Sequence, residues 1–191
     1  MAESKSVIPT CQCSAYGDLP IDKTVIDERV RAFPKVRKDL RQVAHKLVER
    51  WSTHYRLYVC DACGQRWQAS LAKSSVGEWI AFKVPTISLK DWKDQQFVCP
   101  DDIVGYLASR SRYFQQIFDT SSDKCNVDGC DEFAIVHSVK CKQHQFENLV
   151  KVGTLWLLPS GRWFGPYSPA LIDVKQDDQH ADSKPKRANG S

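Results

Sequence analysis

The chain has 191 residues, of which 42% are hydrophobic, 10% aromatic and 26% charged, and its formal net charge is +4. This composition excludes a wholly disordered chain and predicts one medium-sized domain, alone or with a small appended module. Residues 1–9 hold no apolar stretch typical of a signal peptide, and no run of about 18 uncharged apolar residues exists. We therefore expect a cytoplasmic protein without membrane contact.

The first helical elements are expected to follow a flexible leader over residues 1–10. Residues 22–33 predict a short helix that Pro34 interrupts, and proline is well tolerated in the first turn of the next helix. A long amphipathic helix is expected over residues 34–51, because apolar residues recur there at steps of three and four. These apolar residues are Val36, Leu40, Val43, Leu47 and Trp51.

Residues 55–60 alternate and are rich in Tyr, Leu and Val, and together with three later segments they predict a small antiparallel sheet. The predicted strands are 55–60, its hairpin partner 66–70, then 77–84 and a short strand at 96–99. A second helix is expected to begin near Asp101, with Asp101 or Asp102 as its N-cap. The last strand is expected over residues 151–158, and the polar residues 175–191 predict a disordered tail. The expected fold class is α+β, with the long N-terminal helix packed on the sheet and residues 11–174 forming a single domain.

Eight cysteines in a chain expected to occupy a reducing compartment indicate metal binding rather than disulfides. The tightest group is Cys125-x4-Cys130-x10-Cys141-x2-His144, in which four donors fall within 20 residues. A short loop can bring the first two cysteines together, while the last two donors are one helical turn apart. The spacing predicts a zinc site within residues 124–146, with residues 131–140 as a short hairpin and His137 as a competing donor.

A second cysteine pair, Cys60-x2-Cys63, is followed by Gly64, as in a tight metal-binding turn. This pair supplies only two ligands, so it needs two more to complete a tetrahedral zinc site. Cys11 and Cys13 fit this role, because residues two apart in an extended chain point to the same side. We therefore expect two structural zinc ions, one held by four cysteines and the other by three cysteines and a histidine.

Alternatives to this N-terminal group stay open at this point. Cys99 or His54 could replace one of its ligands, although Cys99 is otherwise expected to be a buried thiol in an apolar run. Trp67 is expected to pack against the site. A redox function for the Cys60–Cys63 pair is less favoured, because reactive C-x-x-C pairs usually lie at a helix N-terminus and this pair ends a predicted strand.

Two resemblances follow from these motifs. Residues 124–146 resemble treble-clef-like zinc modules of bacterial and phage proteins, which occur in DNA binders, nucleases and scaffolds alike. The first half of the chain resembles, in outline, small bacterial zinc proteins of immunity-protein type. That resemblance rests on Cys11-x-Cys13, a helix, a strand, and Cys60-x2-Cys63-Gly64 with Trp67. It implies a bacterial protein that binds another protein.

The net charge gives only weak support to nucleic-acid binding. Zinc-bound cysteines are thiolates, so filling both sites would lower the formal charge from +4 to +1. The excess positive charge falls on the predicted helix 34–51, whose exposed face could either be solvated or contact phosphates. Its basic residues are Lys35, Arg37, Lys38, Arg41, Lys46 and Arg50.

No catalytic motif accompanies the metal groups, and both predicted sites are thiolate-rich and closed. We therefore expect a non-catalytic zinc protein that acts as a protein-interaction module, of inhibitor, immunity or adaptor type. A nucleic-acid binder using the basic helix is the alternative, and a treble-clef nuclease is the second alternative. Some of the tryptophans could be interface anchors, although most are expected in the core; the candidates are Trp79, Trp92, Trp156 and Trp163.

Overall fold

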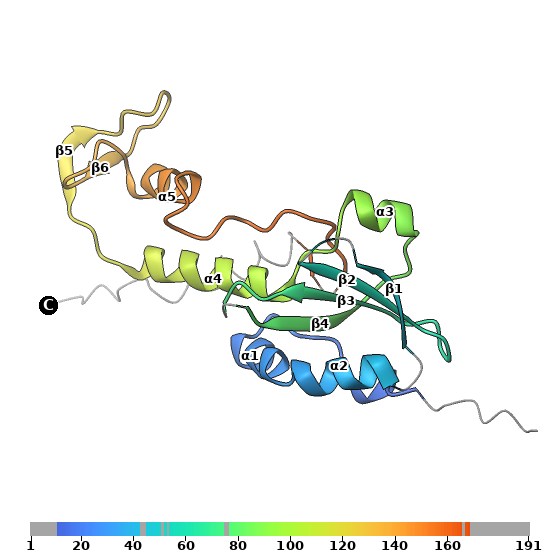
Figure 1. Cartoon of the computed structure of the whole chain (residues 1–191). Helices are drawn as coiled ribbons and strands as arrows, with labels where there is room; N and C mark the ends of the chain where they lie inside the picture. Colours follow the sequence, from blue (N-terminus) through green and yellow to red (C-terminus); the bar gives the residue numbers. More distant parts are fainter. Residues whose placement is uncertain are drawn as a thin grey trace, which may run out of the picture.

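The computed structural model describes residues 11–42, 45–50, 52, 54–74, 77–165 and 167–168, so the predicted leader 1–10 and tail 175–191 lie outside the described residues. The described part contains five α-helices and two antiparallel sheets, a four-stranded sheet of order β1-β2-β3-β4 and a two-stranded sheet β5-β6. The chain is therefore a mixed α and β protein, as predicted. Figure 1 shows α1 and α2 beside β4, the edge strand of the larger sheet, and β5, β6 and α5 at the far end of α4.

The first two helices begin and end where local chemistry requires it. Helix α1 (Lys23–Arg31) is capped by Asp22, whose carboxylate accepts a hydrogen bond from the Val25 amide at 3.1 Å. Pro34 lies in the first turn of helix α2 (Phe33–Gln42), where its missing N–H costs nothing. The predicted short helix and the new helix at Pro34 are both confirmed.

The predicted helix over 34–51 is wrong in its second half. Helix α2 ends at Gln42, and strand β1 (His45–Arg50) pairs antiparallel with β2 (Tyr55–Cys60), with a bulge between Leu47 and Glu49. Leu47 is 43% exposed, so it is not a core position of an amphipathic helix. The apolar residues at 43, 47 and 48 fit a helical period in isolation, but hydrogen bonding to β2 decides the outcome.

The other sheet strands follow their predicted positions. Strands β3 (Arg66–Leu71) and β4 (Trp79–Val84) extend the sheet in register, with Tyr58 opposite Trp67 and Gln68 opposite Phe82. Because side chains alternate along a strand, the sheet has two apolar faces. One face packs on α2 through Tyr58, Cys60, Trp67, Ala69, Ala81, Phe33, Val36 and Leu40.

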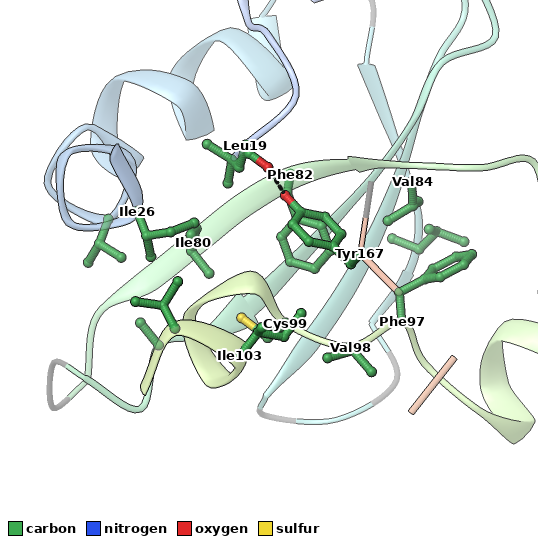
Figure 2. Packing of buried hydrophobic residues seen from close by; sticks show 14 of the residues in the cluster. Leu19, Ile26, Ile80, Phe82, Val84, Phe97, Val98, Cys99, Ile103 and Tyr167 are labelled. Carbon is green, nitrogen blue, oxygen red and sulfur yellow. Dashed lines mark hydrogen bonds between the residues drawn. The ribbon is translucent and has the colours of Figure 1, made fainter. Parts of the chain in front are cut away.

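The opposite face of the sheet carries the larger core, part of which is drawn in Figure 2. It joins Leu57, Ile80 and Phe82 of the sheet to residues of α1, α3 (Leu89–Asp94) and α4 (Pro100–Gln115). Tyr167 closes this core by donating a hydrogen bond to the carbonyl of Leu19 at 2.5 Å. The C-terminal end of the described chain is thereby fixed to its N-terminal segment.

A buried glutamine organises the middle of this core. Gln68 is fully buried, and its carboxamide accepts from the Trp92 indole N–H at 2.8 Å and from the Phe97 amide at 3.0 Å. The same side chain donates to the Phe97 carbonyl and to Ser70. All its hydrogen-bonding capacity is therefore used inside the protein, and Trp92 is a core residue rather than an interface anchor.

Helix α4 begins one residue earlier than predicted. Its N-cap is Cys99, and Pro100 occupies its first turn. Asp101, predicted as a cap, is instead buried and accepts hydrogen bonds from the amide and hydroxyl of Ser74, while Asp102 pairs with Lys73. The neighbouring predicted strand 96–99 is reduced to a single bridge between Phe97 and Arg162.

The predicted last strand over 151–158 is also wrong. Helix α5 (Lys142–Lys151) extends to Lys151, and Gly153 ends it in the left-handed region with a φ of 77°. The Gly153 amide donates to Val150 and the Thr154 amide to Leu149, which are the two bonds of a Schellman motif. The apolar residues after it form an irregular segment that returns toward the sheet (Figure 1).

Trp156 anchors this returning segment on helix α4 at Gly105. A Cβ atom at Gly105 would lie 2.1 Å from the Trp156 ring, so only glycine fits beneath the indole. We expect Gly105→Ala to lower the free energy of unfolding by about 1–3 kcal/mol, although alanine is the better helix former. Urea denaturation measures this change.

The control for this prediction is the same substitution in a Trp156→Ala background. Without the indole, Gly105→Ala should raise the free energy of unfolding by about 0.5–1 kcal/mol, the ordinary helix-propensity gain. A gain of stability in the chain that keeps Trp156 would contradict the packing described here.

Candidate metal centres

The first candidate centre joins the N-terminal segment to the edge of a hairpin. Ligand atoms of Cys11, Cys13, Cys60 and Cys63 all lie within 4.8 Å of one another. Cys13 starts a single turn of 3-10 helix, and Cys60 ends β2. The turn after Cys60 is closed by hydrogen bonds from the Gly64 amide to the Cys60 carbonyl and from the Cys60 amide to the Gln65 carbonyl.

Gly64 permits this turn, because its φ of 75° lies in the left-handed region that favours glycine. The four cysteines differ in solvent exposure, because Cys13 and Cys60 are buried while Cys63 is exposed. Trp67 is fully buried and its indole N–H lies 3.4 Å from Cys13 Sγ. The predicted packing of Trp67 against the group is confirmed, and the group is continuous with the core beneath α2.

The second candidate centre lies between a hairpin and a helix. Ligand atoms of Cys125, Cys130, Cys141 and His144 lie within 4.8 Å of one another. The two sulfurs of Cys130 and Cys141 are 3.8 Å apart, and His144 Nδ1 is 3.3 Å from the sulfurs of both Cys125 and Cys141. Sulfurs at about 2.3 Å from a tetrahedral zinc ion would be separated by about 3.8 Å. The donors therefore already have the spacing that a tetrahedral ion requires.

Each pair of donors in this centre comes from a different local structure. Strands β5 (Thr120–Lys124) and β6 (Phe133–Ile135) are joined by the loop that holds Cys125 and Cys130, and Gly129 bends it with a φ of 76°. Cys141 is the N-cap of α5, and His144 follows one turn later. The partial positive charge of a helix N-terminus favours thiolate ligands at this place.

The segment between Cys130 and Cys141 differs in detail from the predicted hairpin. Strand β6 pairs with β5, which precedes the metal group, and the amide of Ile135 donates to the Lys140 carbonyl to close a tight turn. His137 lies in that turn, exposed and with a φ of 66°, outside the group of four donors. It is therefore not a competing ligand in this arrangement.

Backbone amides stabilise thiolates in both groups. Burial raises the pKa of Cys125, but hydrogen bonds from the amides of Cys141 and Val127, together with His144, lower it to about 6. The amide of Cys13 lowers the pKa of Cys11 in the same way. In contrast, burial raises the pKa of Cys13 to about 12. A bound cation would displace the remaining protons, so metal binding is coupled to proton release.

The hydrogen bonds from backbone amides to cysteine sulfurs share a sequence spacing that was not predicted. Four of the seven cysteines in the two candidate centres accept a hydrogen bond from the amide two residues later along the chain, as Cys99 outside them also does. The pairs are Cys11 with Cys13, Cys63 with Gln65, Cys125 with Val127, and Cys130 with Glu132. Such bonds require tight turns after each cysteine, and Gly64, directly after Cys63, was the visible signal for one of them.

Cys99 and His54, the alternative ligands for the N-terminal group, both lie apart from its four cysteines. Cys99 is buried in the larger core next to Ile103, and burial raises the pKa of its thiol well above the ordinary value. His54 is exposed before β2. Neither belongs to the group formed by Cys11, Cys13, Cys60 and Cys63. Cys99 is thus the buried thiol that the sequence predicted.

No protein-family model, curated protein or solved structure matches this chain. Within the described residues, none of the helices combines the length and the apolar character needed to cross a membrane. What the structure establishes is two groups of cysteine and histidine side chains that are geometrically able to hold metal ions.

Proposed function

We propose that the chain is a non-catalytic zinc-binding protein in which two structural zinc ions support a protein-interaction module. The observation that carries this proposal is the pair of four-donor groups, one of four cysteines and one of three cysteines and a histidine. Thiolate and imidazole donors at tetrahedral spacing suit zinc better than the oxygen-seeking cations magnesium and calcium.

Four protein donors also argue against catalysis at either ion. A catalytic zinc keeps one coordination position for water or substrate, whereas both groups here can saturate a tetrahedral ion. The nuclease alternative loses support for a related reason. His144 is the histidine on the helix of the treble-clef-like module, and its Nδ1 is engaged with the two sulfurs.

The nucleic-acid alternative assumed one continuous basic helix over residues 34–51, but α2 ends at Gln42. Lys46 and Arg50 belong to strand β1, whereas Lys35, Arg37, Lys38 and Arg41 belong to α2. Six basic residues therefore do not form one helical stripe along a phosphate backbone. Lys35 and Lys38 of α2 are exposed, which is consistent with an ordinary solvated helix face.

A protein-binding role is supported by the C-terminal module, which we define as residues 116–151. It projects from the end of α4 away from the larger sheet (Figure 1). Several of its large apolar side chains face solvent, including Ile117 at 96%, Val139 at 62% and Phe133 at 47% exposure. Exposed apolar groups gathered on a small projecting unit are typical of surfaces that bind other proteins.

Native mass spectrometry of the full chain, purified gently without chelator, tests this proposal. We expect a mass increment of two zinc ions and an absorbance spectrum free of nucleic acid. A chain that is folded without metal would overturn the zinc assignment. Co-purified nucleic acid that disappears after Lys35→Glu and Lys38→Glu would instead establish the basic-helix alternative.

A further inference from the structure

We propose that the hollow between the end of α4 and the C-terminal module binds a segment of a partner protein that carries an apolar side chain flanked by basic residues. This inference rests on the proposed protein-interaction function and specifies where the partner binds and what its chemistry is. The hollow has a volume of about 620 Å³, which is within the ordinary range for ligand sites. It is large enough for one or two side chains together with a stretch of backbone.

Half of the residues that line the hollow are apolar or cysteine, and the walls come from the end of α4, the linker after it, the two strands β5 and β6, and the start of α5. Phe114 and Phe118 come from the end of α4 and the linker after it, and Ile135 comes from β6. The aromatic rings of this region also pack on one another, because Phe146 lies 5.1 Å from Phe114 and 5.4 Å from Tyr113 between ring centroids. The hollow therefore has a fixed floor rather than a set of loose side chains.

Two apolar residues at the rim are unusually exposed for their type. Ile117 is 96% exposed and Phe133 is 47% exposed, and both line the hollow. A partner side chain that enters the hollow would remove both from water. A hollow with an aromatic wall and exposed apolar rim residues has the features of a hot-spot region before its partner binds.

The acidic side chains near the hollow indicate which residues should flank the apolar side chain of the partner. Residues 119–135 contain five acidic side chains and a single basic one. The acidic residues are Asp119, Asp123, Asp128, Asp131 and Glu132, all of them exposed and none in an ion pair with another described residue. A zinc ion bound by three thiolates and one imidazole would add one further negative charge.

Three lysines near the hollow offset part of this charge, namely Lys124, Lys140 and Lys142. Lys142 donates to the carbonyls of Phe114 and Gln116 at 2.7 Å, so its ammonium holds the end of α4 to the module. Lys124 donates to the carbonyl of Asp131 and lies 4.4 Å from the Phe133 ring centroid. Residues 114–143 therefore carry five carboxylates and three ammonium groups, a formal net charge of −2, and Glu132 is the acidic residue that lines the hollow. This excess of negative charge attracts lysine or arginine and repels nucleic-acid phosphates.

The test uses a random-peptide phage library selected on the zinc-loaded full-length chain. We expect enriched peptides to share an apolar residue flanked by lysine or arginine. A synthetic peptide of the enriched sequence is then titrated against the chain by fluorescence anisotropy. Its affinity should fall about tenfold or more for Ile117→Ser and for Phe133→Ser, since truncating a hot spot has at least this effect.

Two further measurements complete the test. Leu157→Ser is the matched control, because Leu157 is 63% exposed but does not line the hollow, and it should leave the affinity unchanged. Glu132→Gln and added salt should both weaken binding. Enrichment of acidic peptides, no enrichment at all, or equal affinity for wild type and the Ile117→Ser and Phe133→Ser variants would overturn the inference.

Failure of this inference differs from failure of the proposed function. A two-zinc chain whose enriched peptide is insensitive to Ile117→Ser and Phe133→Ser still binds peptides, but at another surface. A chain without zinc fails before any selection begins. Mass spectrometry of the same preparation distinguishes these two results.

Discussion

Replacing Cys60 with serine is expected to remove one zinc ion and to unfold the larger sheet at ordinary temperature. Cys60 is 1% exposed at the end of β2, and its group is continuous with the core that holds α2 on the sheet. Structural zinc contributes about 10–16 kcal/mol to small zinc-binding folds, whereas whole domains are stable by only about 5–15 kcal/mol. Losing one ligand therefore removes a large fraction of the total stability. Native mass spectrometry and a thermal melt followed by circular dichroism check both parts of the result.

Cys99→Ser is the matched control for this experiment. Cys99 is also a buried cysteine, but it is the N-cap of α4 and belongs to neither metal group. Serine is a preferred N-cap residue, so the variant should keep both zinc ions and most of its stability. Two zinc ions and an unchanged melting temperature in Cys60→Ser would contradict the N-terminal site.

Replacing Cys141 with serine is expected to disorder the C-terminal module while the larger sheet stays folded. The four donors of this centre all lie within residues 125–144, and β5, β6 and α5 have few other means of holding together. The module contacts the rest of the chain mainly through rings around Tyr113 and Phe146 at the end of α4. Loss of the ion should therefore remain local, with hydrogen-exchange protection lost in β5, β6 and α5 and retained in β2, β3 and β4.

His137→Ala provides the control for the C-terminal site. His137 is exposed and lies in the turn between β6 and α5, outside the four-donor group. Its replacement should leave both zinc ions and the protection pattern unchanged. Loss of protection in the larger sheet of Cys141→Ser would show instead that the module and the sheet unfold as one unit.

Much of this fold is visible in the sequence where one local signal dominates. Strands β2 and β3 carry the alternating pattern and β4 is a short apolar run before Pro85; glycine-containing turns separate the three. Proline in a first turn and the apolar period locate α2 and α4. Both metal groups were predicted from ligand spacing, because thiolate pairs in tight turns have few other uses in a chain expected to be reduced.

The errors occur where two local signals compete. Residues 43–48 fit a helical period, yet β1 forms because β2 has a free edge to pair with. The largely apolar residues 151–158 favour a strand by sequence pattern. In the structure, Gly153 ends helix α5 there, and Trp156 packs on Gly105. These outcomes depend on tertiary partners, which periodicity alone does not contain.

The hollow beside the C-terminal module was not visible from the sequence at all. It requires Ile117 and Phe133 to be brought to one rim by the linker after α4 and by β6. Either residue alone looks like an ordinary core position. Only their exposure in the folded chain, together with the acidic residues within 119–135, indicates a binding surface.

Zinc K-edge X-ray absorption of the metal-loaded chain tests the central claim most directly. Seven sulfurs and one nitrogen shared by two ions give an average first shell of 3.5 sulfurs and 0.5 nitrogen per zinc. The account predicts this shell, four-coordinate, with zinc–sulfur distances of about 2.3 Å and a zinc–nitrogen distance of about 2.0 Å. A shell rich in oxygen, or one with five or six ligands, would contradict two closed structural sites.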